Sequence, residues 1–277
     1  NFQPGDTLAI DLAKSGLTAD FSTPGQLVLT GSASLSTYES VLKSVTYKTD
    51  SQNPNTDART ITVRVTDTDG AASAPIVRTV SVVSVNDAPT LTKPTAVIAS
   101  AMAATEQTTL VLSGKGLQVG DVDAGSAPMT LTLKVASGVL SVANSLNANG
   151  VSTDFGIKVL SGNGTNTLTL AGTQDQINNF LGSVDASKSA LTYTNPSNTP
   201  ASSDQLTVTI NDNGAAGTGG ALSATQYFPI SIQAVNDAPV FAAGASFTTI
   251  TEDQTTNSGQ TVASIATGIS DVDGHGV

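Results

Sequence analysis

The sequence has no cysteine, no tryptophan and only one histidine, and aromatic residues make up 4% of its 277 positions. Without cysteine there can be no disulfide, no thiolate zinc ligand and no thiol nucleophile. The single histidine, His275, argues against a Ser-His-Asp triad and rules out a histidine-rich metal site. The scarcity of these residues therefore excludes several common enzyme classes.

Positive charge is also scarce. Eleven lysine and arginine residues stand against 22 acidic residues, which gives a formal net charge of −11. A chain this acidic has no basic surface for nucleic acid or for anionic lipid. It also has no apolar run that approaches the ~20 residues of a membrane-spanning helix. We expect no nucleic-acid partner and no membrane insertion.

Glutamate is rare among the acidic residues: 19 are aspartate and three are glutamate. Aspartate disfavours helices because its side chain competes for backbone hydrogen bonds, and it is common in turns. The chain is also rich in threonine, serine, glycine and valine. This composition is typical of a β-rich protein with many turns.

An internal repeat organises the chain. The string VNDAP occurs at residues 85–89 and 235–239, and the triplet Asp-Val-Asp occurs at 121–123 and 271–273, so both motifs recur after 150 residues. Agreement of several ordered motifs at one spacing indicates a tandem array. We predict the later part of one repeat at 1–86, a complete repeat at 87–236 and the beginning of a third at 237–277. We expect the chain to be a fragment of a longer array.

The residue pattern within the repeats predicts β-sandwiches. Leu206, Val208 and Ile210 alternate with threonine, and the run 61–66 repeats this alternation. A period of two is the signature of a strand with one buried face. Turn sequences such as Asn-Gly at 149–150 separate these runs, and many short strands with such turns favour a Greek-key sandwich. The predicted fold class is therefore all-β, with tandem Greek-key β-sandwiches.

One short helix is expected in each repeat. Residues 36–45 place apolar side chains at helical spacing, and Ser36 and Glu39 are spaced as a capping box. In the next repeat, Thr173 and Gln176 have the same spacing before Ile177, Phe180 and Leu181. The aromatic residues of both helices are expected to be core residues.

The acidic motifs are the candidates for a site, because the strand directions bring them together at the ends of the predicted sandwiches. Clustered carboxylates without a basic partner are unfavourable unless a cation lies among them. Asp-x-Asp motifs beside asparagine favour calcium over magnesium, which retains more water. The alternative is that these aspartates only cap turns. The first predicted cluster comprises Asn86, Asp87, Asp121, Asp123 and Asp212. The second comprises Glu106, Asn236, Asp237, Asp271 and Asp273.

These motifs resemble cadherin repeats. The run VNDAP at 235–239, the glutamate at 106, the Asp-Val-Asp triplets and the aspartate at 212 follow the cadherin order. The chain is more similar still to the cadherin-like tandem repeats, joined by VNDAP, of large bacterial surface adhesins. The resemblance implies a secreted, extracellular rod with Ca²⁺ at each junction. The linker is one residue shorter than in animal cadherins and lacks one of their acids, so one or two ions per junction are expected.

The sequence is compatible with three functions. The first is a calcium-stiffened extender of a bacterial adhesin or surface fibre, which supports cell adhesion or biofilm attachment at the cell surface. Its partners would be the neighbouring repeats of the chain, other copies of it, or a cell-surface or matrix ligand. The second is a module that binds carbohydrate or protein, with Tyr227 and Phe155 as the residues to test. The third, a two-carboxylate glycosidase, is disfavoured because the acids are expected at solvated module ends. We therefore predict no enzymatic activity.

Overall fold

The computed structural model describes residues 1–92, 102–214, 216–241, 246, 249–256, 259, 261 and 268–274. His275 lies outside the described residues. The chain divides into two compact units. Unit 1 comprises residues 1–89, 121–127 and 212–222, and unit 2 comprises residues 90–120, 128–211 and 223–277. The division into three repeats at 86 and 236 remains a prediction about sequence repeats, since these units are defined by spatial contacts.

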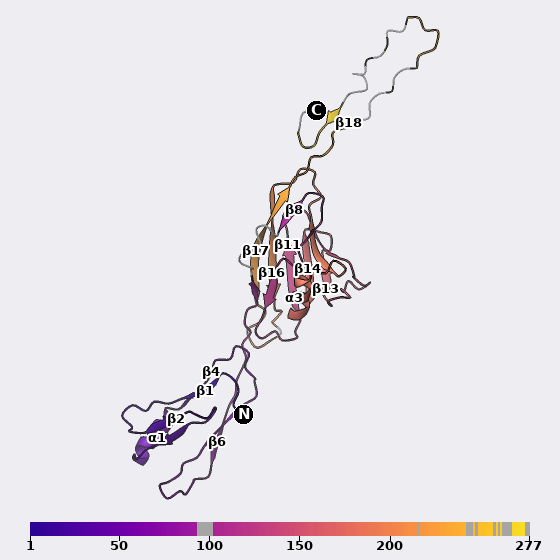
Figure 1. The fold of residues 1–277 in the computed structure, drawn as a ribbon. Coiled ribbons are helices and arrows are strands. Elements are labelled where there is room, and N and C mark those ends of the chain that lie inside the picture. The colour runs from indigo at the N-terminus through magenta and orange to yellow at the C-terminus, as the bar shows by residue number, and fades with distance from the viewer. Residues whose placement is uncertain are drawn as a thin grey trace. The chain divides into compact units, whose positions relative to one another are not determined.

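Unit 1 contains short strands and one helix (Figure 1). Its elements are β1 (Asp6–Ala9), β2 (Thr18–Asp20), β3 (Val28–Thr30), α1 (Leu35–Lys43), β4 (Thr46–Thr49), β5 (Arg59–Val63) and β6 (Ile76–Val80). They form three antiparallel pairs, β1 with β4, β2 with β3, and β5 with β6. The strand predicted for 61–66 is formed only in part: β5 ends at Val63, and both Val63 and Val65 are exposed.

Unit 2 holds the remaining elements. They are β7 (Thr90–Thr92), β8 (Ala103–Thr105), β9 (Leu110–Val111), β10 (Gln118–Gly120), β11 (Met129–Lys134), β12 (Val139–Ala143), β13 (Lys158–Ser161), β14 (Thr167–Gly172), α3 (Gln174–Gly182), β15 (Ala190–Thr194), β16 (Ser203–Asn211), β17 (Ser223–Gln233), β18 (Val240–Phe241) and β19 (Ile269–Ser270).

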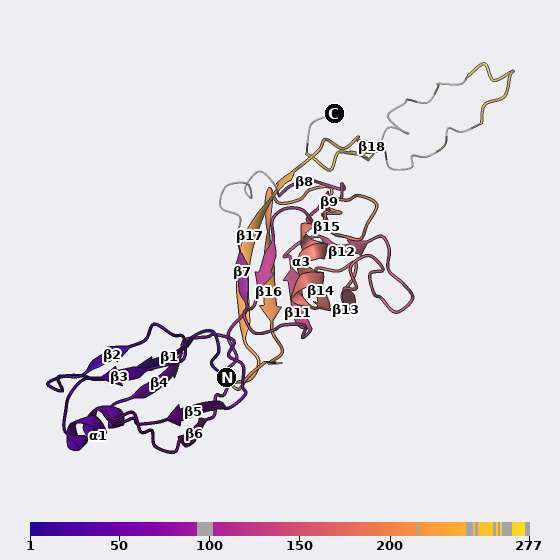
Figure 2. The ribbon, with the colours of Figure 1, turned by 60° about the horizontal axis from the view of Figure 1, so that its bottom comes forward.

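The described strands of unit 2 form a sandwich. A six-stranded sheet has the order β13-β14-β11-β16-β17-β8, and a three-stranded sheet has the order β12-β15-β9. All neighbours are antiparallel except β17 and β8. Figures 1 and 2 show the long strands of the six-stranded sheet side by side. Two further antiparallel pairs join β7 with β10 and β18 with β19. This arrangement confirms the all-β sandwich fold class.

The core of unit 2 comes from the predicted alternating residues. Leu206, Val208 and Ile210 of β16 are fully buried, while the threonines between them are half-buried. Leu140, Leu191 and Tyr193 contribute from the three-stranded sheet, and further large buried side chains come from β11, β14, β17 and helix α3. Burying this apolar area is the main source of stability for such a sandwich.

Helix α3 begins where the sequence predicted. Thr173 is its N-cap, and a complete capping box joins Thr173 with Gln176. The helix packs against β10, β14 and β15 with Ile177, Phe180 and Leu181 buried. The aromatic residue of α3 is thus a core residue, as expected.

Helix α1 differs from its prediction. Its N-cap is Ser34, whose hydroxyl accepts a hydrogen bond from the Thr37 backbone N–H at 3.1 Å. The predicted capping box of Ser36 and Glu39 is therefore wrong. Glu39 lies one turn into the helix and pairs with Lys43 at 2.7 Å instead. Ser34 has the extended backbone that an N-cap needs.

Candidate functional site

All five residues of the first predicted cluster lie in unit 1. Asn86 and Asp87 belong to the VNDAP segment, and Asp121 and Asp123 follow directly after β10. β7, which begins just after that segment, pairs antiparallel with β10, so that Gly120 lies opposite Thr90. This pairing brings the Asp-Val-Asp triplet beside the linker, as its place in the sequence predicted. We call this cluster the first site.

Hydrogen bonds join the members of the first site. The backbone N–H of Asp87 donates to Asp123 Oδ2 at 3.1 Å, and the Asn86 side-chain amide donates to Asp212 Oδ2 at 2.6 Å. Asp121 Oδ1 accepts the backbone N–H groups of Asp123 and Ala124, both at 3.1 Å. The aspartates thus order a turn, as the turn-cap alternative predicts, but they also converge on the linker.

Three oxygen atoms of the first site are buried and have no hydrogen-bond partner: Asn86 Oδ1, Asp121 Oδ2 and Asp123 Oδ1. Asn86 and Asp123 are 6% and 8% exposed. A buried oxygen without a donor is unfavourable by roughly 1–3 kcal/mol. These atoms are all hard acceptors, which is the donor chemistry that Ca²⁺ uses.

Electrostatics distinguishes the acids of this site. Burial and the neighbouring Asp123 carboxyl raise the pKa of Asp121, because two close carboxylates resist being charged together. Burial would also raise the pKa of Asp212, but hydrogen bonds from the backbone of Leu222 and Gly214 and from Asn86 outweigh it and lower that pKa. The Asp212 carboxylate therefore has hydrogen-bond donors, one of which is the Asn86 amide. Asp121 and Asp123 each keep one oxygen atom without a donor.

The second predicted cluster lies in unit 2 and repeats part of this arrangement. The backbone N–H of Asp237 donates to Asp273 Oδ2 at 2.5 Å, and that of Asp273 donates to Asp271 Oδ1 at 2.9 Å. These two bonds match those of the first site 150 residues earlier. Glu106, which is 3% exposed, accepts the backbone N–H of Val235 at 2.9 Å through Oε1. We call this cluster the second site.

Two oxygen atoms of the second site are also buried without a partner, Glu106 Oε2 and Asp237 Oδ2. The two sites together therefore account for five of the six such atoms in the described part of the chain, the sixth being an Arg59 nitrogen. The sites differ at asparagine: Asn86 is buried, whereas Asn236 is exposed and donates to the backbone carbonyl of Asp237.

Sequence reasoning missed several residues around the first site. Gln52 donates to Asp87 Oδ1 at 3.4 Å, and Asn53 donates to the Val122 carbonyl at 3.2 Å. Neither residue is charged or belongs to a repeated motif, so nothing in the sequence marks them. Thr218, in the glycine-rich sequence that follows β16, contacts the linker through its backbone.

The described residues bring no three Asp, Glu, His or Cys side chains into a ready-made metal-binding group. Those residue types do not include asparagine, whose side-chain oxygen can also bind a cation, as can backbone carbonyls. The oxygens without partners nevertheless fit a cation in chemistry, because each is a buried carboxylate or amide oxygen that lacks a donor. The calcium-ligand role of the ten predicted residues remains a prediction.

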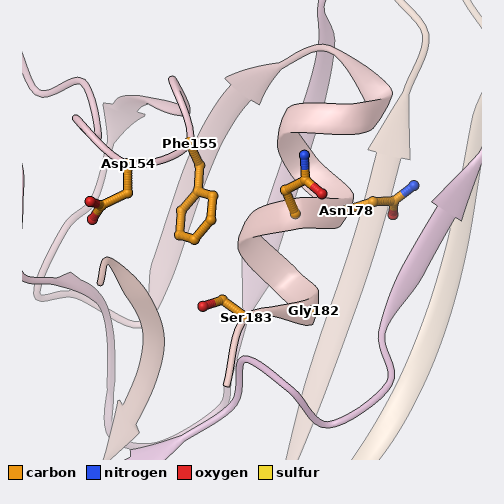
Figure 3. Close-up of a pocket in the computed structure, with 6 residues that line it drawn as sticks. Asp154, Phe155, Asn178, Gly182 and Ser183 are labelled. Carbon is orange, nitrogen blue, oxygen red and sulfur yellow. The ribbon is translucent and has the colours of Figure 1, made fainter. Parts of the chain in front are cut away.

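The residues proposed for ligand recognition lie elsewhere. Phe155 lines a pocket of about 420 Å³ beside α3 with Asp154, Asn178 and Ser183 (Figure 3). Its ring packs edge-on against Phe180 at 6.2 Å, and the Lys188 ammonium lies 5.8 Å from its centroid.

The polar side chains of this pocket bind the protein itself. Asp154 accepts hydrogen bonds from Ser189, and Asn178 bonds the backbone of Val119. Tyr227 is 52% exposed on β17. None of these contacts favours a carbohydrate site.

No protein-family model matches the chain, and no curated protein matches it in sequence. A solved structure of the extracellular cadherin domains 1–5 of protocadherin gamma B2 is similar over 84% of this chain and 34% of that one, with 16% identity and a TM-score of 0.33. The chain thus spans about a third of that protocadherin's length.

An endo-fucoidan hydrolase of glycoside hydrolase family 107 is similar over 86% of this chain and 26% of that chain, with 17% identity and a TM-score of 0.23. Both TM-scores lie below 0.5, so these similarities assign neither a family nor an activity. In the described residues, neither helix has the length and apolar character needed to cross a membrane.

Proposed function

We propose that this chain is a calcium-stiffened structural repeat of an extracellular bacterial adhesin or surface fibre, which supports attachment of the cell. The observation that carries the proposal is the set of buried oxygens without donors, Asn86 Oδ1, Asp121 Oδ2 and Asp123 Oδ1 at the first site and Glu106 Oε2 and Asp237 Oδ2 at the second. A cation would satisfy them and offset part of the net charge of −11. Ca²⁺ fits best because it accepts carboxylate, amide and backbone oxygens in flexible geometry.

Calcium would act here on the linker segments. Extracellular modules bind it with dissociation constants of about 0.1–1 mM. At about 1 mM calcium, each independent site then stabilises the folded state by about 0.4–1.4 kcal/mol. That is enough to order a linker and weak enough to be reversed by a chelator. The proposal therefore assigns calcium a mechanical role and assigns the chain no reaction.

The test is calcium binding by wild type and by two matched variants. The variant Asp121→Asn/Asp123→Asn removes the triplet charges of the first site. The control, Asp67→Asn/Asp69→Asn, changes another Asp-x-Asp turn with the same hydrogen bond, from the Asp69 N–H to Asp67 Oδ1 at 3.1 Å, but exposed to solvent.

We expect calorimetry to show calcium binding to the wild type and to the control, and the loss of one class of sites in the first variant. Calcium should also raise the melting temperature of wild type by a few degrees. If 10 mM calcium neither binds nor changes melting, or if the two variants behave alike, the proposed function is wrong.

A further inference from the structure

The connection between β16 and β17 lies directly against the linker. Within unit 1, the Thr218 backbone N–H donates to the Ser84 carbonyl at 2.9 Å, and the Asn86 N–H donates to the Thr218 carbonyl at 2.7 Å. The Thr218 hydroxyl also donates to the Ser84 carbonyl, at 3.1 Å. Together these contacts make a parallel bridge between Val85 and Thr218. We call residues 216–220 the clamp loop.

Glycine permits this close approach. A Cβ atom on Gly217 would lie 2.7 Å from the backbone carbon of Val85 and 2.8 Å from the backbone nitrogen of Asn86. Both atoms belong to the main chain and cannot be rotated away. The φ angle of Gly217 is also +66°, in the left-handed region that favours glycine. The clamp loop therefore needs glycine at 217 for two separate reasons.

The clamp loop also fixes the orientation of the Asn86 side chain. The Asn86 amide nitrogen donates both to the Gly220 carbonyl, at 3.0 Å, and to Asp212 Oδ2. Both partners are acceptors, so only the NH₂ end of the amide can face them. The other end, Oδ1, is consequently turned away from the loop, and it is the buried oxygen without a partner.

From these contacts we infer that the clamp loop is a positioning element, which holds the linker without a cation and presents Asn86 Oδ1 to the cation of the first site. The inference rests on the proposed function for the identity of the ligand, but the clamp contacts themselves need no metal. In the described residues of the second site, Asn236 has no comparable contacts and is exposed. The first site should therefore bind calcium more tightly than the second.

Two glycine substitutions make a matched pair, one inside the clamp loop and one outside it. Gly217→Ala puts a methyl group against the linker backbone. Gly16→Ala has a similar conformational cost, since Gly16 has a φ of +70°, but its Cβ would meet nothing within 4 Å. Only the first variant should displace the linker.

The experiment has two readouts on the full chain. Amide hydrogen exchange in chelator measures the clamp, through the N–H groups of Asn86 and Thr218. Calcium titration followed by amide NMR shifts of Asp123 and Asp273 measures the two sites separately. We expect both clamp amides to be protected in metal-free wild type, and protection to fall about tenfold or more in Gly217→Ala. That variant should weaken the first site about 3–10-fold, whereas Gly16→Ala should leave the first site unchanged and neither variant should change the second site.

The possible failures are distinguishable. If the clamp amides exchange freely in chelator while calcium still binds, the clamp is wrong and the proposed function stands. If the two glycine variants bind calcium equally well at the first site, the positioning role is wrong. If the amides are protected but wild type binds no calcium, the proposed function fails, and the presentation of Asn86 to a cation fails with it.

Discussion

Two tyrosines at equivalent positions of the repeat each donate a hydrogen bond to a buried aspartate. Tyr47 donates to Asp6 Oδ1 at 2.6 Å in unit 1, and Tyr193 donates to Asp204 Oδ2 at 3.1 Å in unit 2. Asp6 lies on β1, whereas Asp204 lies on β16, where the first repeat has Arg59. Both repeats therefore contain a hydrogen bond from a tyrosine hydroxyl to an aspartate carboxylate, but the aspartate lies on a different strand in each.

The two aspartates are stabilised differently. Arg59 Nε donates to Asp6 Oδ2 at 2.8 Å, and both side chains are almost fully buried. Asp204 instead accepts the backbone N–H groups of Ala136 and Ser137 and the Ser137 hydroxyl, each at 3.0 Å. The repeat pattern did not predict the partners of these tyrosines, because the paired aspartates occupy different positions of the repeat.

Acid should weaken unit 1 through Asp6. Burial alone would raise the pKa of Asp6, but hydrogen bonds from Arg59, Tyr47 and the Gln3 backbone lower it from 3.8 to about 2. Since the folded pKa lies below the unfolded one, this stabilisation is complete above pH ~4 and is lost as the pH falls towards 2. It amounts to at most about 2.5 kcal/mol.

Urea unfolding at pH 6, 4 and 2.5 tests this expectation against the variant Asp6→Asn. At pH 6 the variant should be less stable by about 3 kcal/mol, because Arg59 is left buried without its partner. The difference between variant and wild type should shrink at pH 2.5. A constant difference across the three pH values would contradict the assigned pKa of Asp6.

Among the elements, the helices show what sequence patterns can and cannot define. The Thr173–Gln176 capping box predicted the start of α3 correctly because one side-chain pair satisfies two backbone groups. Ser34 and Ser36 both precede the apolar residues of α1, so spacing alone could not choose the N-cap. The choice depends on the backbone, which is extended at Ser34.

The α3 cap should contribute measurably to stability. Thr173→Ala removes the hydroxyl that accepts the Gln176 N–H at 3.3 Å, but it keeps the backbone N–H that donates to Gln176 Oε1. We expect a loss of about 1 kcal/mol, whereas Thr173→Ser keeps the cap and should lose less than half of that. Thermal or urea unfolding measures the difference, and equal losses in the two variants would argue that packing of the Thr173 methyl matters more than the cap.

Strand periodicity predicted which side chains could face a core, but not whether a core would cover them. Leu206, Val208 and Ile210 are fully buried in unit 2, where β16 lies inside a six-stranded sheet of the sandwich. In the matching run of unit 1, Val63 at the end of β5 and Val65 beyond it are exposed, since the described strands of unit 1 form only two-stranded pairs. Burial depends on the opposing layer, which is not encoded in the strand itself.

At the scale of the whole molecule, the repeat allowed the two acidic sites to be predicted. Motifs that recur at one spacing indicated which acids meet the linker, and Asp87 with Asp123 and Asp237 with Asp273 do so. The clamp loop could not be predicted in this way. Its contacts join residues 134 positions apart, and glycine-rich sequence carries no pattern that specifies a partner.

Salt and calcium should both reduce the electrostatic repulsion between the clustered carboxylates. Without metal, the clustered acids of a chain with net charge −11 repel one another, and raising NaCl to about 1 M shortens the Debye length to ~3 Å. We expect NaCl to raise the melting temperature in chelator and to have less effect with saturating calcium. The variant Asp121→Asn/Asp123→Asn should depend less on salt in chelator. An equal salt effect with and without calcium would contradict a charge-based role of the ion.

The spacing of the bonds within the first site implies an order of assembly. Asp87 and Asp123 are 36 residues apart, whereas Asn86 and Asp212 are 126 residues apart. Closing the longer loop costs about 1 kcal/mol more in chain entropy. The triplet can therefore meet the linker as soon as β7 and β10 pair, while Asn86 receives its partners only after β16 has entered the sheet. Completion of the first site thus reports that the intervening sandwich has folded.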